Sequence, residues 1–339
     1  MLAVAPLAAQ TYLSSPRRAL TAPELLDAPD EWITRSLAWV DDMLARRVQY
    51  GFEAGKLTQA EEAVHRAALI RLDDILHIDA APGKVLIQQW YQRRMLAAAK
   101  RIRSRSVRDL NITKLYDHGW FVQTPSCRFA IDLVGGAPQN AGFQMSEEAM
   151  DLMVASADTL FISHWHSDHA DPKVARKFLA AGKPVVAPAD VFREEPALQK
   201  QLTVQVRNVQ QSSSYAKVSV IAMPGHQGKD VINNCYLFHT QESFKLLHTG
   251  DQSNDDDFTW IDTIHRDHRI DVFLPNCWTP QPLRFTKGVA ARLILPGHEN
   301  EMAHTVPHRE DWTQTFSRFE GCTGFMLPLC WGEEVLYRS

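Results

Sequence analysis

Apolar side chains in the first hundred residues recur at helical intervals. After Pro29-Asp30-Glu31, apolar residues return every three or four positions, which predicts an amphipathic helix; they are Ile33, Leu37, Val40, Leu44 and Val48. A second helix is predicted from Thr58, because Thr58 and Glu61 have the spacing of a capping box. A third follows Pro82-Gly83 and places Leu86, Trp90 and Met95 on one face. We therefore expect residues 1–110 to form a helical region.

From residue 111 to 339 the pattern changes to short β-rich runs separated by turns and helices. The runs "ITKLYDHGWFVQTP" and "CRFAIDLVGG" predict a hairpin. Further strands are predicted at 158–163, 184–188, 203–207, 216–223, 232–239, 243–249, 271–276, 291–296 and 324–330. Helices are predicted near 146–156, 172–181, 190–199, 255–267 and 310–319. This mixture indicates an α/β fold in which helices cover layers of sheet.

Composition and charge narrow the function classes. The formal net charge of -4 does not favour a polyanionic partner, so nucleic acid is not expected. The basic run from Arg93 to Arg108 is interpreted as a solvated helix end. No apolar run reaches the roughly 18 residues that a membrane span needs. We expect a small-molecule substrate and no membrane partner, and we leave self-association into a homo-oligomer open.

The cysteines and the N-terminus bear on the compartment. The five cysteines are scattered without paired spacing, which is typical of reduced core residues. The opening "MLAVAPLAAQ" resembles the tail of a secretory signal but lacks a basic segment. A cytoplasmic location is preferred, and an exported or periplasmic protein with a truncated signal peptide is the alternative.

Potential metal ligands follow four of the predicted strands. "TLFIS" leads directly into "HWHSDH", and "KLLHTGD" delivers Asp251. "VSVIAMPGH" and "ARLILPGH" each combine a strand, a Pro-Gly turn and a histidine, namely His226 and His298. Side chains carried on the ends of rigid strands can converge on one point, so the pattern predicts a metal site.

Local geometry divides the first cluster. Alternate residues of an extended segment share a face, so His164 and His166 can hold one metal ion. Asp168 and His169 come where the chain turns into the next helix, with Asp171 as N-cap, and can swing toward a second ion. Imidazoles and carboxylates without thiolates favour Zn²⁺ or another first-row ion such as Fe²⁺ or Mn²⁺. The other nine histidines, among them His118, are interpreted as surface or core residues.

With the H-x-H-x-D-H hexad, His226, Asp251 and His298 in this order, the chain resembles the metallo-β-lactamase superfamily of binuclear metal hydrolases over residues 111–339. The resemblance implies an αββα sandwich preceded by the helical region. It also implies ligand roles: His164, His166 and His226 for one ion, Asp168, His169 and His298 for the other, and Asp251 as a bridge. Asp132 matches the family's aspartate that supports the ligand loop by hydrogen bonds.

The resemblance also implies a reaction. A hydroxide bridging two Zn²⁺ ions, with Mn²⁺ or Fe²⁺ as alternatives, would cleave an ester or lactone, an amide or a phosphodiester, and Asp168 would orient it and handle the proton. The motifs "DHADP" and "HTGD" are most similar to the branch containing ascorbate-6-phosphate lactonase. His304 and Trp278 are candidates for contact with substrate or ligands. The alternatives are a mononuclear iron dioxygenase of the same superfamily and a non-catalytic metal-binding scaffold.

Overall fold

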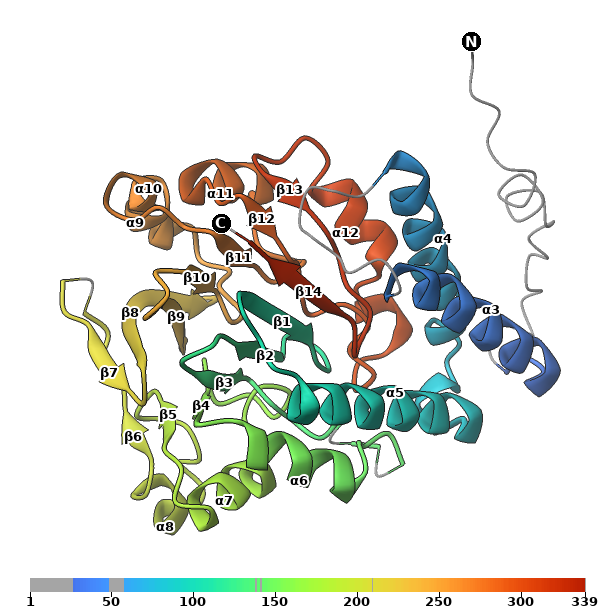
Figure 1. The fold of residues 1–339 in the computed structure, drawn as a ribbon, viewed down its shortest axis with the longest axis horizontal. Helices are drawn as coiled ribbons and strands as arrows, with labels where there is room; N and C mark the ends of the chain where they lie inside the picture. The colour runs from blue at the N-terminus through green and yellow to red at the C-terminus, as the bar shows by residue number, and fades with distance from the viewer. Residues whose placement is uncertain (1–26, 49–57, 138, 141, 209, 339) are drawn as a thin grey trace.

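The computed structural model describes residues 27–48, 58–137, 139–140, 142–208 and 210–338. The signal-like segment at residues 1–10 lies outside these ranges. Within them, two seven-stranded sheets face each other (Figure 1). The first has the order β14 (Glu334–Tyr337), β1 (Leu110–Lys114), β2 (Trp120–Gln123), β3 (Arg128–Ile131), β4 (Thr159–Phe161), β5 (Val185–Ala187) and β6 (Thr203–Val204). The second has the order β13 (Phe325–Met326), β12 (Leu293–Ile294), β11 (Val272–Leu274), β10 (Lys245–His248), β9 (Val231–Thr240), β8 (Val218–Gln227) and β7 (Ser213–Tyr215).

Helices cover the outer face of each sheet. Figure 1 shows a row of helices below the first sheet, namely α5 (Val85–Ser104), α6 (Glu147–Ser156), α7 (Pro172–Ala180) and α8 (Pro196–Gln199). The second sheet carries α9 (Phe258–Ile261), α10 (Ile264–Asp267) and α11 (Pro282–Val289). To one side lie α3 (Asp30–Val48), α4 (Gln59–Leu76) and α12 (Trp312–Arg318). The described residues also form three short 3₁₀ turns, at Ala81–Gly83, Asp255–Asp257 and Val306–His308.

Strands that are buried on both faces explain the layers. In β2, Trp120 and Val122 point between the sheets, whereas Phe121 points toward the helices. In β11, Leu274 likewise points between the sheets and Phe273 points outward. Because successive side chains leave a strand on opposite faces, each sheet needs an apolar partner on both sides. The outcome is the four-layered αββα arrangement expected from the sequence, preceded by helices.

Two predicted helix caps are confirmed. Thr58 caps α4 through a full capping box with Glu61, and the Asp171 carboxylate accepts hydrogen bonds from the first turn of α7. No helix among the described residues is long and apolar enough to span a membrane. The five cysteines are free, and four of them are buried.

Several local predictions were wrong. The run 112–125 forms two strands, because the chain reverses at Leu115–Gly119 with Asp117 in the left-handed region (φ 51°). The predicted helix 190–199 shortens to Pro196–Gln199 after Phe192, which has φ 56°. The predicted helix 255–267 is broken into a 3₁₀ turn, α9 and α10. Strands β7 and β14 and helix α11 were not predicted.

The basic residues of α5 were interpreted as a solvated helix end, but several of them bind the C-terminal part of the chain. Arg94 donates to the Trp331 carbonyl, and Arg101 donates to the Gly332 carbonyl. Arg105 pairs with Glu334 at the start of β14. These arginines therefore attach the helix to the C-terminal strand.

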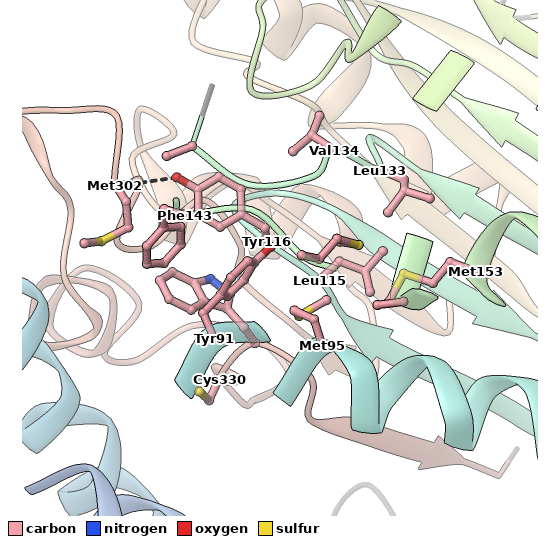
Figure 2. Close-up of a cluster of buried hydrophobic side chains, with 14 of the residues drawn as sticks. Tyr91, Met95, Leu115, Tyr116, Leu133, Val134, Phe143, Met153, Met302 and Cys330 are labelled. Carbon is pink, nitrogen blue, oxygen red and sulfur yellow. Dashed lines mark hydrogen bonds between the residues drawn. The ribbon is translucent and has the colours of Figure 1, made fainter. Parts of the chain in front are cut away.

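An aromatic cluster joins α5 to the turn between β1 and β2. Tyr91 stacks on Phe143 with ring centroids 4.6 Å apart and meets Tyr116 edge-on at 5.8 Å (Figure 2). The Met302 backbone N–H donates to the Tyr116 hydroxyl at 2.7 Å, drawn as a dashed line in Figure 2. Because Tyr116 precedes Asp117, this cluster fixes the position of that turn.

Helix α4 holds the segment that follows β12. The Asp73 carboxylate accepts hydrogen bonds from Asn300 Nδ2, Trp312 N, and the backbone and hydroxyl of Thr313, all at 3.0 Å. His77 Nε2 lies 2.7 Å from the Arg309 carbonyl. Burial raises the pKa of Asp73 to about 7, although these donors pull it down. The N-terminal helices are thus tied directly to residues 299–313.

The raised pKa of Asp73 predicts a pH-dependent stability. The folded state binds this proton more tightly than the unfolded chain, whose ordinary pKa is 3.8. The contribution of Asp73 to stability is therefore complete below about pH 4 and is lost as the pH rises through about 7. The free energy of unfolding of the wild type minus that of Asp73→Asn should fall from pH 5 to 7, by up to about 1.4 kcal/mol per pH unit. Urea unfolding monitored by tryptophan fluorescence measures it.

The neighbouring Asp74→Asn variant is the matched control, because the Asp74 side chain is 41% exposed. Its difference from the wild type should stay flat with pH. A flat difference for Asp73→Asn as well would contradict the buried, proton-binding role of Asp73.

Candidate metal centre

The hexad lies in a tight loop between β4 and α7. The His166 carbonyl accepts hydrogen bonds from the backbone N–H groups of His169 and Ala170, at 3.0 and 2.8 Å. This turn brings His169 back beside His164, with ring centroids 4.2 Å apart. The predicted turn after His166 is therefore present, and it brings four potential ligands together.

Two further ligand-bearing segments reach the same place from the second sheet. Asp251 follows β10, and His298 follows β12. The backbone is left-handed at Gly250 (φ 50°) and at His298 (φ 78°). A side chain at position 250 would collide with Asn233 and Ser163, so a glycine is needed where the chain turns Asp251 inward. A non-glycine residue at positive φ, such as His298, is strained and is typical of functional sites.

One group of donor atoms surrounds His169. Its Nε2 atom lies 3.0 Å from Asp168 Oδ2 and 3.2 Å from Asp251 Oδ1. The same atom lies 3.8 Å from Asp117 Oδ2. His298 Nε2 lies 3.4 Å from both Asp168 Oδ2 and Asp251 Oδ2. Asp117, Asp168, His169 and His298 are all buried and can offer atoms within 4.8 Å of one another.

A second group consists of His164, His166 and Asp251. His164 Nε2 lies 3.0 Å from His166 Nδ1 and 3.6 Å from Asp251 Oδ2. The Asp251 carboxylate therefore lies within reach of both groups.

The structure does not bring His226 into either group. The Pro224-Gly225 pair lies inside β8, opposite Asn234 and Asn233, and does not form the predicted turn. Proline is tolerated there because this end of β8 is an edge. His226 instead has Nδ1 3.1 Å from Asp257 Oδ1 and Nε2 3.2 Å from Arg207.

The residue after His226 takes the inward position. Gln227 Nε2 donates to Asp251 Oδ2 at 3.1 Å. Successive side chains of a strand point to opposite faces, so His226 and Gln227 cannot both face Asp251 in this register.

Asp132 holds the ligand loop from below. Its carboxylate accepts hydrogen bonds from Ser163 N at 2.7 Å and Ser163 Oγ at 2.6 Å. Its Oδ2 atom also lies 2.8 Å from His169 Nδ1. This contact leaves His169 Nε2 free to face the carboxylates, which is the usual arrangement of a carboxylate that orients a ligating imidazole.

Two residues that lie beside these ligands, Asp117 and His118, were not predicted from the sequence as part of the site. Asp117 was hidden inside a run interpreted as one strand, and His118 was assigned to the structural histidines. His118 lies with its ring 4.3 Å from that of His248 and can form a further group with His169 and Asp251. The Asp-His-Gly sequence at 117–119, in which Gly119 permits a tight turn, was the available signal for a ligand-bearing turn.

Several buried atoms of the site fit the presence of metal ions. Among the described residues, the following lack a hydrogen-bond partner: His169 Nε2, Asp251 Oδ1, His298 Nδ1 and both Asp117 oxygens. Buried polar atoms are normally paired, and unpaired ones that face one another indicate an absent ligand. Imidazole and carboxylate donors suit first-row divalent ions.

The pKa shifts of the buried aspartates and histidines also fit the presence of metal ions. Burial raises the pKa of Asp168 and Asp251, but His169 outweighs it and holds both values well below the usual range. Burial lowers the pKa of His169 and His298, but the carboxylates outweigh it and raise both well above the usual value. Positive charge is therefore strongly favoured at this point, and bound divalent ions would supply it with the imidazoles in the neutral form that ligates.

A pocket of about 870 Å³ opens onto this cluster. Trp165 lies beside His166 with ring centroids 4.3 Å apart, and Trp278 meets His298 edge-on at 5.6 Å. His304 also lines the pocket and lies 2.9 Å from Glu301 through its Nδ1 atom. The full lining is Gln139, Trp165, His166, Ser167, Asp168, Gln227, Asp251, Trp278, His298, Glu301, Ala303, His304, Thr305, His308 and Glu310.

The fold is similar to that of solved metal-dependent hydrolases. A metallo hydrolase of Ignicoccus hospitalis, Igni18, matches with a TM-score of 0.51 and 15% identity, covering 68% of this chain and 100% of its own. A possible metal-dependent hydrolase of Veillonella parvula matches with a TM-score of 0.52 and 12% identity, covering the same shares. The metallo-β-lactamase fold protein YhfI of Bacillus subtilis has a TM-score of 0.49 and 14% identity, covering 67% of this chain and 99% of its own.

No protein-family model matches the sequence, and no curated protein matches it. At these identities the matches show the fold alone, an αββα sandwich that Igni18 and the Veillonella parvula protein share with this chain.

The Asp132 contacts predict a role in metal affinity. Asparagine tolerates the left-handed backbone found at position 132 (φ 45°), so Asp132→Asn should fold. It replaces the acceptor that orients His169, and metal affinity should fall about 10- to 100-fold. Competition with a chromophoric chelator measures this affinity, and Asp230→Asn on an exposed turn is the control. Equal affinity in Asp132→Asn and the control would contradict the role.

Proposed function

We propose that this protein is a binuclear metal-dependent hydrolase of a small molecule, cleaving a lactone, another ester or an amide. The observation that carries the proposal is the Asp251 carboxylate, which lies 3.2 Å from His169 Nε2 through one oxygen and 3.6 Å from His164 Nε2 through the other. His164 and His166 would hold one ion, and Asp168, His169 and His298 the other, with Asp251 shared. Zn²⁺ suits this donor set, and Mn²⁺ or Fe²⁺ are the alternatives.

Two bound divalent ions would lower the pKa of a bound water toward 7 and polarise the bond to be cleaved. The chain supplies the orientation and the proton handling. Asp168 is the most accessible carboxylate of the cluster, with a side chain 12% exposed against 1% for Asp251 and 0% for Asp117. Its low pKa keeps it ionised, so it can accept a hydrogen bond from the attacking water. Because it also lines the pocket, it can pass that proton to the leaving group.

The pocket supports a small-molecule substrate. Its volume of about 870 Å³ lies within the range typical of small-ligand sites. Trp165 and Trp278 give it apolar walls beside the two proposed ion positions. Trp165 is itself held by Arg193, whose guanidinium carbon lies 4.9 Å from the ring centroid.

The charge of the pocket favours an unphosphorylated substrate. None of its described lining residues is a lysine or an arginine, whereas Glu301 and Glu310 add negative charge beside Asp168. A phosphate group is normally bound through arginine or lysine side chains in addition to any metal. The motifs "DHADP" and "HTGD" resemble a lactonase branch that is named for a phosphorylated lactone, so they support the type of bond, and the preference against phosphate rests on the pocket charge alone. We therefore favour an uncharged or cationic lactone, ester or amide over a phosphodiester.

The arrangement of ligands also bears on the alternatives. A mononuclear iron dioxygenase would use fewer ligands and leave part of the buried Asp168, His169 and His298 group without a role. A non-catalytic scaffold does not account for the open pocket beside the cluster. Both groups of ligands have a use only in a binuclear enzyme.

Removal of metal and of Asp168 tests the proposal. Chelation should abolish hydrolysis, and Zn²⁺, Mn²⁺ or Fe²⁺ should restore it. Asp168→Asn should lower kcat/KM about 10²- to 10⁴-fold, because it removes the group that handles the proton. Steady-state kinetics on a panel of lactones, esters and amides measures both, with Asp230→Asn as the control. Activity that survives chelation, or a fully active Asp168→Asn enzyme, would refute the hydrolase.

Paired substrates test the inferred substrate class. The enzyme should prefer 4-nitrophenyl acetate to bis(4-nitrophenyl) phosphate, and a lactone to its phosphorylated analogue, by about tenfold or more in kcat/KM. The reason is that the pocket places carboxylates where a phosphate would need cations. Glu301→Gln and Glu310→Gln should reduce the discrimination against the phosphorylated lactone. Preference for the phosphodiester in the wild type would overturn the assignment.

A further inference from the structure

Asp117 is fixed in the turn between β1 and β2 with its side chain fully buried. Its backbone carbonyl accepts hydrogen bonds from Lys114 Nζ and from the His298 backbone N–H. Its own backbone is left-handed, with φ 51°. The packing of the preceding residue, Tyr116, and the hydrogen bond from the His298 backbone N–H therefore determine where the Asp117 carboxylate points.

Neither carboxylate oxygen of Asp117 has a hydrogen-bond partner among the described residues. Oδ1 lies 3.3 Å from His298 Nδ1, but that nitrogen also lacks a hydrogen-bond partner. Asp132 provides the contrast, because it forms true hydrogen bonds with Ser163 and lies 2.8 Å from His169 Nδ1 within hydrogen-bonding geometry. Asp117 thus does not have the geometry of a carboxylate that only orients a ligating imidazole.

The unpaired oxygens face the second ion position. Oδ2 lies 3.8 Å from His169 Nε2, the atom also approached by Asp168 and Asp251. A carboxyl group that is buried without hydrogen bonds either takes up a proton or is compensated by a cation. We propose that Asp117 is an additional ligand of the second metal ion, and that it raises the affinity of this position for Mn²⁺ or Fe²⁺ relative to Zn²⁺. The inference rests on the proposed binuclear function.

Ligand composition gives the selectivity. With Asp117, the second position has carboxylates from Asp117, Asp168 and Asp251 beside the imidazoles of His169 and His298. The first position has two imidazoles and a share of Asp251. Carboxylate ligands suit Mn²⁺ and other hard ions, whereas fewer ligands with more nitrogen suit tetrahedral Zn²⁺. The two positions are therefore expected to differ in the ion they prefer.

Metal binding by the full chain tests the inference without relying on activity. The protein is stripped with a chelator and dialysed against Mn²⁺ alone, Zn²⁺ alone or an equal mixture, and bound ions are counted by mass spectrometry. Electron paramagnetic resonance of the Mn²⁺ form reports whether two ions lie close enough to couple. The variants are Asp117→Asn, which keeps the shape and accepts a left-handed backbone, and Asp117→Gly, which suits φ 51° and removes the side chain. Asp230→Asn is the control.

The wild type should bind two coupled Mn²⁺ ions and, from the mixture, retain more Mn²⁺ than either Asp117 variant. Both Asp117 variants should bind the second Mn²⁺ on the order of tenfold or more weakly, lose the coupled signal and shift toward Zn²⁺. Unchanged Mn²⁺ binding and coupling in the two variants would overturn the inference. Circular dichroism and thermal unfolding establish whether the variants are folded. If Asp117→Asn does not fold, Asp117→Gly provides the test.

The number of ions bound by the wild type and by the variants distinguishes a failure of this inference from a failure of the proposed function. A wild type that binds one ion per chain refutes the binuclear hydrolase. In that case a loss of the single ion in Asp117→Asn still supports Asp117 as a ligand, and an unchanged single ion overturns that role too.

Discussion

Three buried aspartates, Asp117, Asp168 and Asp251, face one imidazole nitrogen of His169, and the rest of the site depends on holding them there. Like charges at such distances repel strongly where water is excluded. The chain offsets this repulsion in part by raising the pKa of His169 and His298. Divalent ions bound as proposed would offset it more completely, because they would attract every carboxylate at once. The proposed metal binding, the preference in substrate charge and the proton transfer all depend on this concentration of negative charge.

The fold supplies the rigidity that such a cluster requires. Its members come from loops that follow β4, β10 and β12 and from the turn between β1 and β2, so both sheets must keep their relative position. Left-handed backbone at Asp117, Asp132 and His298 stores strain that the surrounding packing has to hold. The N-terminal helices contribute to that packing, since Asp73 on α4 holds the segment after His298 and Tyr91 on α5 packs against Tyr116. The N-terminal helices therefore help to position the site, whether or not they can fold on their own.

Much of this could be predicted from periodicity and spacing. The capping box at Thr58, the Asp171 N-cap and the strands that precede the hexad, Asp251 and His298 follow from local rules that tertiary contacts did not override. His226 lies outside both ligand groups, because the pairing of β8 with β9 keeps Pro224 and Gly225 in a strand, where the sequence had suggested a turn, and sets the register. Asp117 was missed, since its Asp-His-Gly signal lies inside a run interpreted as one strand and its neighbours at the site are more than 50 residues away in sequence. Register and long-range convergence are decided by the whole sheet, and a single sequence does not display them.

A binuclear centre requires two metal ions, one on either side of Asp251. Anomalous diffraction from crystals grown with Zn²⁺ or Mn²⁺, recorded at the absorption edge of each metal, locates them. Two peaks are expected roughly 3.5–4 Å apart, one beside His164 and His166 and the other beside His169 and His298. A single peak, or peaks away from Asp251, would rule out the binuclear centre.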